Sequence, residues 1–211
     1  MEIYRLVFSP IEVNTYILAD ESGDCAIIDC GCYGNDECEE LRTFISGKKL
    51  RPVLLLNTHC HLDHIFGNEF MLREYNLRTR YSRDDEYNRI KAPSHAALFG
   101  LSMDESPEPE SYIGDNELIS FGKTGLKALS VPGHSRGGLA FYSEKDGCVF
   151  TGDALFAGSI GRTDLEGGDY QTLMDSITGR LFVLPPSTVV WPGHGHETTI
   201  EREKMTNPFF S

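Results

Sequence analysis

The most chemically informative stretch of the sequence is Thr58-His59-Cys60-His61-Leu62-Asp63-His64. It places three imidazoles and one carboxylate, all able to bind a metal, within six positions: His59, His61, Asp63 and His64. This set of donors suits zinc, and it also suits iron or manganese. A polar loop whose histidines only cap the following helix is the alternative, and it does not account for so dense a cluster.

Three further metal-binding residues follow predicted strands in the second half of the chain. They stand in Pro132-Gly133-His134, Phe150-Thr151-Gly152-Asp153 and Pro192-Gly193-His194. In each case an apolar run ends, a glycine gives the backbone freedom, and a potential ligand comes next. A single Pro-Gly-His is typical of an ordinary turn. Together with the first cluster, however, these residues give seven ligands, enough for two metals, whereas His95 and His196 are expected outside the site.

Apolar runs separated by turn residues predict the strands that position these ligands. Val53–Asn57 is a continuous apolar run, which fits a strand buried on both faces. The other predicted strands are Ile3–Phe8, Thr15–Ala19, Cys25–Asp29, Leu118–Phe121, Leu126–Val131, Leu139–Ser143, Cys148–Thr151 and Thr188–Trp191.

Helices are predicted where apolar residues recur at helical spacing. Leu41, Phe44 and Ile45 share one face of a helix that Asp36 caps. Further helices are expected at Ile65–Tyr75, Tyr87–Leu101, Tyr170–Leu181 and Thr198–Met205.

The order of these elements predicts the fold class. Strands dominate each half of the chain and a helix closes each half, so we expect two β-sheets packed face to face with helices outside, an α/β (αββα) sandwich. No linker of Gly/Ser or Pro composition divides the chain, so residues 1–211 are expected to form one domain. Along the first ligand segment, alternation should send His59, His61 and Asp63 to one side, and the turn into the next helix should bring His64 round to join them.

Composition excludes several classes of protein. The chain has 211 residues and a formal net charge of −13, which argues against non-specific binding of DNA or RNA. No apolar run approaches the roughly 20 residues of a membrane span. The first residues lack the pattern of a signal peptide. We therefore expect a cytoplasmic protein that acts on a small molecule, with neither nucleic acid nor membrane as a partner.

Six cysteines stand in the sequence, four of them within fourteen residues. A chain of this length in a reducing compartment does not need disulfides to hold its core. We expect free and mostly buried thiols, with a redox role or adventitious metal binding as the alternative. The six are Cys25, Cys30, Cys32, Cys38, Cys60 and Cys148.

These motifs resemble the metallo-β-lactamase fold superfamily, and within it glyoxalase II (hydroxyacylglutathione hydrolase) and its short relatives. The resemblance runs from Asn14-Thr15-Tyr16 to Pro192-Gly193-His194-Gly195, and its most specific stretch is the segment FTGDALFAGSIGRTD from Phe150 to Asp164. It implies two mixed sheets in the αββα sandwich of that fold, with the site along one edge of both sheets.

The resemblance also implies two divalent metal ions, with zinc expected first and iron or manganese as alternatives. The implied ligands are His59, His61 and His134 for one metal, Asp63, His64 and His194 for the other, and Asp153 between them. Asp63 and Asp153 would be the catalytic carboxylates. Two such cations can hold a water between them and lower its pKa towards neutrality, so that the hydroxide attacks an acyl carbon. A small thioester suits this site, because a thiolate leaves without a strong general acid.

Substrate binding is implied at Arg162 and Asp164. Arg162 matches a basic residue that contacts the thiol carrier in the family, but Asp164 stands where a substrate-contacting tyrosine is common. Only 17 residues follow His194, so we expect the C-terminal helical domain that helps glyoxalase II bind glutathione to be absent.

Other activities share this pattern. Gly161-Arg162-Thr163-Asp164 also resembles persulfide dioxygenases, which are mononuclear iron enzymes of the same fold, and that resemblance implies His59, His134 and Asp153 as ligands. A hydrolase of small esters or lactones is a further alternative, as is a binding module without catalysis. Periplasmic β-lactamases need an export signal, which the sequence does not show.

Overall fold

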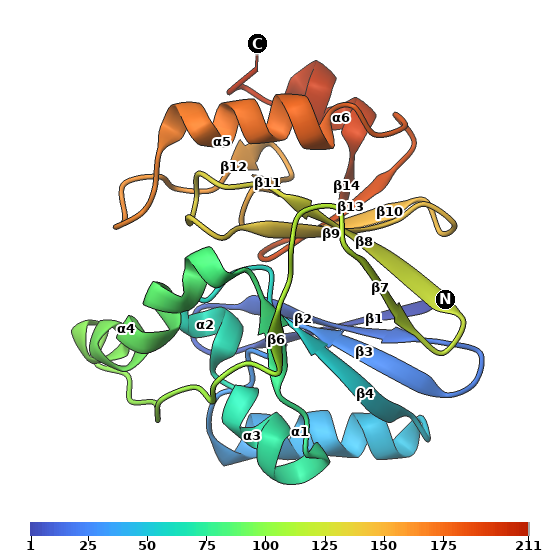
Figure 1. The fold of residues 1–211 in the computed structure, drawn as a ribbon, viewed down its shortest axis with the longest axis vertical. Coiled ribbons are helices and arrows are strands. Elements are labelled where there is room, and N and C mark those ends of the chain that lie inside the picture. Colours follow the sequence, from blue (N-terminus) through green and yellow to red (C-terminus); the bar gives the residue numbers. More distant parts are fainter. Residues whose placement is uncertain (211) are drawn as a thin grey trace.

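Two six-stranded β-sheets lie face to face at the centre of the structure, a computed structural model that describes residues 1–210 (Figure 1). The first sheet holds the N-terminal strands in sequence order: β1 (Glu2–Phe8), β2 (Val13–Ala19), β3 (Asp24–Ile28), β4 (Arg51–Leu56), β5 (Thr79–Tyr81) and β6 (Ser111–Tyr112). β1 to β3 pair antiparallel and β3 to β6 pair parallel, so this sheet is mixed.

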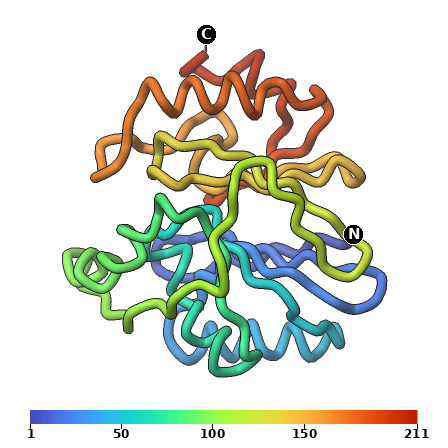
Figure 2. Tube along the Cα trace, viewed as in Figure 1, coloured from blue at the N-terminus to red at the C-terminus, as the bar shows by residue number. Residues whose placement is uncertain are grey.

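The second sheet comes from the C-terminal half of the chain, and Figure 2 shows one layer completed before the other begins. Its order is β14-β13-β10-β9-β8-β7, in which β10 and β13 pair parallel and the other neighbours antiparallel. Its strands are β7 (Leu118–Phe121), β8 (Thr124–Ser130), β9 (Leu139–Ser143), β10 (Cys148–Gly152), β13 (Val189–Pro192) and β14 (Thr198–Thr199). A separate hairpin consists of β11 (Leu155–Phe156) and β12 (Ser159–Ile160).

Alternating side chains of the strands fill the space between the sheets. In β2, Tyr16 and Leu18 belong to the core between the sheets, whereas Ile17 packs in the core under the outer helices. All of β2 is buried because both faces of the strand are covered. The core between the sheets also contains Ala26, Ile28, Leu56, Leu126, Ala128, Phe141 and Phe150. Burial of this apolar surface is the main force that holds the layers together.

Helices cover the outer face of each sheet and complete the predicted α/β sandwich (Figure 1). Leu41 and Met71 pack against the first sheet, and Leu173 and Ile200 against the second. The elements that carry them are α1 (Gly34–Gly47), α3 (Asn68–Tyr75), α5 (Tyr170–Ser176), which continues into a π-helical turn (Ile177–Leu181), and α6 (Ile200–Thr206). Within residues 1–210, no helix combines the length and apolar character needed to cross a bilayer.

The segment between β4 and β7 closes one side of the sandwich. It carries α2 (Leu62–Ile65) and, after the 3-10 turn Arg83–Asp85, α4 (Glu86–Leu98). The two helices pack around Cys60, Tyr81 and Ala92. The helix predicted over Tyr87–Leu101 is thus present as α4, and it packs beside the first ligand cluster.

The predicted strands are all present, with ends displaced by at most two residues. The prediction that Val53–Asn57 is buried on both faces was wrong for its first residues, because Val53 is 37% exposed whereas Leu55 and Leu56 are fully buried. The first residues of this strand lie at the solvent-exposed end of the sheet, where Arg51 forms an ion pair with Asp24. The strands β5, β6, β11, β12 and β14 escaped prediction, since two or three residues carry no periodic signal.

Two predicted helices differ from the observed helices, one because of packing and the other because of capping. The helix expected over Ile65–Tyr75 is divided into α2 and α3 at Gly67, where a Cβ would lie 2.5 Å from Cys30 Sγ. Asp36 does not cap α1, since Tyr33 is the N-cap residue. Asp36 lies in the first turn, where its negative charge favours the helix dipole.

Candidate metal centre

The predicted ligands come from the ends of strands in both sheets. β4 leads into the loop that carries His59 and His61, and β10 is followed directly by Asp153. β8 and β13 lead through short turns to His134 and His194. Strand ends are rigid, so they can hold side chains from distant parts of the chain against one another.

The structure brings all seven predicted ligands into one cluster. Three overlapping groups of donors occur, and within each group the ligand atoms lie within 4.8 Å of one another. The groups are His59, His61 and His134; His59, His64 and Asp153; and Asp63, His64 and His194. We call the first group the first site and the third group the second site. Asp153 lies in the group between them.

The local geometry differs from the predicted alternation along an extended segment. His61 is the N-cap residue of α2, so Asp63 and His64 lie on the helix rather than on an extended strand. Asp63 consequently faces His194, with 3.1 Å between Asp63 Oδ2 and His194 Nε2. His61 Nδ1 instead lies 2.9 Å from His134 Nε2. The helix that begins at residue 62 therefore separates the two sites.

Three of the histidines bond to an oxygen through the ring nitrogen that faces away from the cluster. His64 Nδ1 donates to Asp29 Oδ2 at 2.9 Å, His134 Nδ1 to the Arg162 carbonyl at 2.8 Å, and His194 Nδ1 to the Glu12 carbonyl at 3.1 Å. Because these oxygens can only accept, the proton stays on Nδ1. This arrangement is usual for metal-binding histidines, since it aims the Nε2 atom at the metal.

The inner atoms of the cluster fit a cation. His134 Nε2 carries a lone pair, yet it lies 3.2 Å from His59 Nε2 as well as close to His61. Among residues 1–210, His64 Nε2 and Asp153 Oδ1 are both buried without a hydrogen-bond partner, 3.4 Å apart. Buried polar atoms are seldom left in this way. Imidazole nitrogens and carboxylate oxygens that converge with unused lone pairs match the donor sets of zinc, iron and manganese.

Electrostatics differ between the two sites. Burial, reinforced by the neighbouring imidazoles, lowers the pKa of His59 well below its ordinary value and that of His61 to about 3. Burial also opposes the charged form of His64, but the carboxylates of Asp63 and Asp153 outweigh it and raise the pKa of His64. The lowered pKa values keep His59 and His61 neutral near neutral pH, whereas a metal at the second site must compete with a proton for His64.

Two glycines allow the strand ends to approach so closely. A Cβ on Gly193 would lie 2.1 Å from Asp153 Oδ1, so any side chain there would displace that carboxylate. Gly152 has φ of +51°, and a Cβ there would lie 2.3 Å from Thr58 Oγ1. Gly193 is thus required by close approach alone, and Gly152 by both close approach and its positive φ.

Asp29 is a functional residue that the sequence interpretation missed, having placed it only at the end of a strand. It is 1% exposed and holds the second site from behind. Besides His64, its carboxylate accepts from Thr58 N at 2.7 Å and Thr58 Oγ1 at 2.6 Å. The available signal was that Asp29 directly follows β3, the strand that pairs with β4. Its role in orienting His64 is visible only from the hydrogen bond between the two residues.

Asp85, also missed, holds the first site from behind. It is fully buried at the end of the turn before α4. Its carboxylate accepts from the backbone N–H of Cys60, between His59 and His61, and from Gly137 N at 3.1 Å, three residues after His134. One buried carboxylate therefore ties together the two loops that supply the first site.

Arg162 and Asp164 lie beside the cluster but do not contact it through their side chains. They form a two-pronged ion pair, with Arg162 Nε and Nη2 each 2.7 Å from an Asp164 oxygen. That hydrogen bonding lowers the pKa of Asp164 to about 2. Both side chains are more than half exposed, so they are available to a ligand. His196 is likewise exposed and lies outside the three groups.

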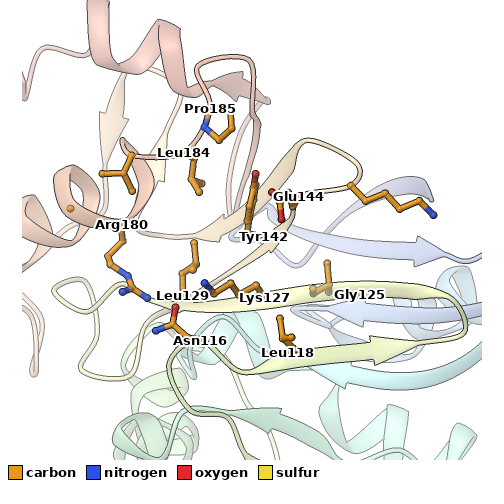
Figure 3. A pocket seen from close by; sticks show the side chains of 14 residues that line it. Asn116, Leu118, Gly125, Lys127, Leu129, Tyr142, Glu144, Arg180, Leu184 and Pro185 are labelled. Carbon is orange, nitrogen blue, oxygen red and sulfur yellow. The ribbon is translucent and has the colours of Figure 1, made fainter.

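Cavity size does not mark the site. A groove of about 670 Å³ lies on the second sheet, and Figure 3 shows Arg180 and Leu184 above the strand that carries Lys127 and Leu129. None of the predicted ligands lines this groove. The cavity bordered by ligands, His59 among them, measures only about 10 Å³. The site is therefore marked by its donor atoms.

This fold and donor set define a class of protein, and sequence comparison agrees. The metallo-beta-lactamase superfamily profile matches residues 9–194, so the chain belongs to that superfamily of metallo-hydrolases. It is 35% identical to the probable metallo-hydrolase YqgX of Bacillus subtilis, covering 100% of this chain and 98% of that protein. It is 32% identical to the hydroxyacylglutathione hydrolase GloC of Haemophilus influenzae, covering 100% and 99%.

Solved structures agree on the fold. The BLEG-1 B3 metallo-beta-lactamase superposes with a TM-score of 0.92 at 30% identity, over 100% of both chains. TTHA1623 in a di-iron-bound form superposes with a TM-score of 0.89 at 34% identity, over 98% of this chain and 99% of that one. The predicted metallo-β-lactamase α/β sandwich is thereby confirmed.

Acidification should remove the metal of the second site before that of the first. His59 and His61 have lowered pKa values and stay neutral as the pH falls, whereas His64 and His194 have raised pKa values and gain protons earlier. Metal content after dialysis from about pH 8 to about pH 5 should therefore fall in two steps. Calorimetry in buffers of different ionisation enthalpy should show proton release for the second metal. Loss of both metals in one step would contradict this order.

Asp85→Asn should weaken metal binding at the first site by about tenfold or more, with a smaller effect on the second. The amide cannot accept from both the Cys60 and Gly137 N–H groups. Asp20→Asn is the matched control, because Asp20 is also buried and accepts from Lys123 N at 3.0 Å and Thr124 Oγ1 at 2.9 Å, but at the opposite end of β2. Competitive chelator titration measures both affinities. Equal effects of the two variants would reduce Asp85 to a general stabilising role.

Proposed function

We propose that the protein is a binuclear metal hydrolase of the glyoxalase II type that cleaves a small thioester. The observation that carries the proposal is the pair of adjacent donor groups, with Asp153 in the group between them. The full-length similarity to a hydroxyacylglutathione hydrolase supports the thioester as substrate. The proposed partner is thus a small S-acyl thiol, which includes hydroxyacylglutathione.

The residues would divide the metal ions as two sets with a shared carboxylate. His59, His61 and His134 would hold one ion, with zinc as the first choice and iron or manganese as alternatives. The other set is Asp63, His64 and His194. When bound, two such ions supply an activated water and polarise the acyl carbonyl. Asp63 and Asp153 would be the catalytic carboxylates in this proposal, because Asp63 belongs to the second site and Asp153 to the group between the two sites.

The protein contributes orientation and proton handling. The Arg162 carbonyl fixes His134 with its proton on Nδ1, and Asp29 does the same for His64. Deep burial of His59 and His64 removes competing solvent from their inner nitrogens. A thiol has a pKa of about 8.5, so a thiolate leaves readily near neutral pH without a general acid. This chemistry therefore suits a site whose imidazoles would be engaged as metal ligands, so that none of them would be left to protonate an alkoxide.

Arg162 and Asp164 are proposed to bind the thiol carrier. The guanidinium carries a permanent charge and a planar fork that fits carboxylates. Asp164 occupies that fork, so an acidic carrier would compete with Asp164 for it. Asp164 thus sets how readily Arg162 becomes available.

The direct test combines metal analysis with a substrate panel. The purified protein should contain about two metal ions per chain and should hydrolyse S-lactoylglutathione or another small thioester faster than simple esters, lactones or a β-lactam. Metal analysis separates a two-metal hydrolase from a mononuclear iron oxygenase, and oxygen uptake with a persulfide tests the latter directly. One iron per chain with persulfide-dependent oxygen uptake would overturn the proposal.

Asp63→Ala should lower the metal content from about two ions to about one. Asp63 is a ligand of the second site alone, so the first site keeps its three histidines. Thioester turnover should fall by more than the roughly 10–100-fold typical of a lost outer-shell contact. His196→Ala, which removes an exposed histidine beside the site, is the matched control and should change neither quantity. If the wild type and the Asp63→Ala variant each contain one iron and have equal activity, the oxygenase is favoured. Its implied ligands are His59, His134 and Asp153, so Asp63 is not among them.

Arg162→Ala should raise KM for an acidic thioester about tenfold, with a smaller effect on kcat. Loss of one charge-assisted hydrogen bond corresponds to about 1.5 kcal/mol, or about tenfold in affinity. Arg180→Ala is the matched control, because Arg180 pairs with Asp115 at a groove that contains no predicted ligand. An unchanged KM with reduced thermal stability would assign Arg162 to a purely structural ion pair.

A further inference from the structure

Three of the six cysteines lie in a row beneath the loop that follows β3. Cys32 Sγ lies 3.7 Å from Cys30 Sγ and 3.5 Å from Cys38 Sγ, so Cys32 is the central thiol. Among the described residues, donors close enough to share a metal occur at the metal centre, and these three thiols do not form such a group. Their pairwise contacts therefore fit thiol chemistry better than coordination of a metal.

The row leads from the interior to the surface. Cys30 and Cys32 are at most 1% exposed, whereas Cys38, in the second turn of α1, is partly exposed. Cys32 and Cys38 both line a cavity of about 480 Å³ between α1 and α3. A small reactant can thus reach Cys38 first, with Cys32 directly behind it.

The backbone makes room for these sulfurs. A Cβ on Gly67 would lie 2.5 Å from Cys30 Sγ and 2.6 Å from Cys32 Sγ, so only glycine leaves the two thiols their space. Gly67 N also donates to the Cys30 carbonyl at 2.8 Å, which fixes the loop against the start of α3. The thiols are therefore held close together by the fold.

We propose that Cys32 and Cys38 form a reversible disulfide by reaction with small-molecule disulfides. The Cys38 thiolate attacks a disulfide RSSR, which forms Cys38–S–S–R and releases one RSH after protonation. Cys32 then attacks Cys38 Sγ, which forms the Cys32–Cys38 bond and releases the second RSH. Two protein thiols are oxidised and one disulfide is reduced by two electrons. The site does not rest on the proposed hydrolase activity.

The resting form is the dithiol. Contact with the neighbouring thiol and burial raise the pKa of Cys38, so little thiolate is present at neutral pH. Closing the bond requires the two sulfurs to move from 3.5 Å to about 2 Å apart. The reaction is therefore slow, and it responds to sustained exposure to disulfides.

The test treats the folded, reduced full-length protein with glutathione disulfide and follows intact mass and thiol content. Wild type should lose two thiols and two hydrogen atoms, and peptide mapping should place the bond between Cys32 and Cys38. Cys32→Ser should instead stop at the first step and carry one glutathione on Cys38. Reduction with dithiothreitol should restore the original mass in both cases.

Matched variants separate this site from general thiol oxidation. Cys38→Ser should slow thiol loss by about tenfold, since the accessible thiol is gone, while Cys30→Ser should stay within about twofold of wild type. Cys148→Ser removes a buried cysteine of the second sheet and should have no effect. Circular dichroism confirms the fold of each variant. The proposal is overturned if wild type keeps its thiols, if the bond maps elsewhere, or if Cys38→Ser reacts as fast as wild type.

Discussion

Seven metal-binding side chains face one another where the two sheets meet, and four of them are buried. Such a concentration of lone pairs and negative charge is costly unless a cation neutralises it. Apolar burial holds the sheets together, but it does not fix their relative position to a fraction of an ångström. Polar bonds from β2 to the end of β13 do so: Asn14 N donates to Gly193 O at 2.7 Å, and Tyr16 Oη donates to Pro192 O at 2.6 Å. These bonds set the distance of His194 from the ligands of the first sheet.

Behind the ligands, the two sites depend on different buried carboxylates. Asp29 comes from the first sheet and orients His64, whereas Asp85 comes from the segment before α4 and holds the loops of His59 and His134. Both carboxylates also hold the loop that follows β4, Asp29 at Thr58 and Asp85 at Cys60, so the two sites share the support of that loop. The pKa values distinguish the sites as well, because burial dominates at His61 and lowers its pKa, whereas the nearby carboxylates outweigh burial at His64 and raise its pKa. The cluster therefore consists of two unequal groups of potential metal ligands built on one rigid edge.

The fold and the clustering of the seven potential ligands could be predicted because each rests on a strong local signal. Buried strands are continuous apolar runs, and each ligand stands directly after such a run. The groups behind the ligands could not be predicted, since Asp85 meets Gly137 only after α4 has packed across the edge of the sandwich. The predicted orientation of Asp63 was wrong for a similar reason. The helix begins at residue 62, and the local sequence does not distinguish a helix that begins there from an extended segment that continues to Asp63. Contacts between distant segments were thus the missing information.

The backbone of Arg162 supports a potential ligand, whereas its side chain faces solvent. Its carbonyl holds His134 Nδ1 at 2.8 Å, while its side chain is exposed and paired with Asp164. Side chains in this loop can therefore change without moving a ligand, provided that the carbonyl stays in place. One fold can serve different reactions, and this chain is 32% identical to a hydroxyacylglutathione hydrolase and 30% identical to a B3 metallo-beta-lactamase. Substrate choice is then expected to depend on the exposed side chains around the edge. Arg162 is one of these residues whose carbonyl holds a donor histidine, His134, and exposed Glu12 is another, because its carbonyl holds His194.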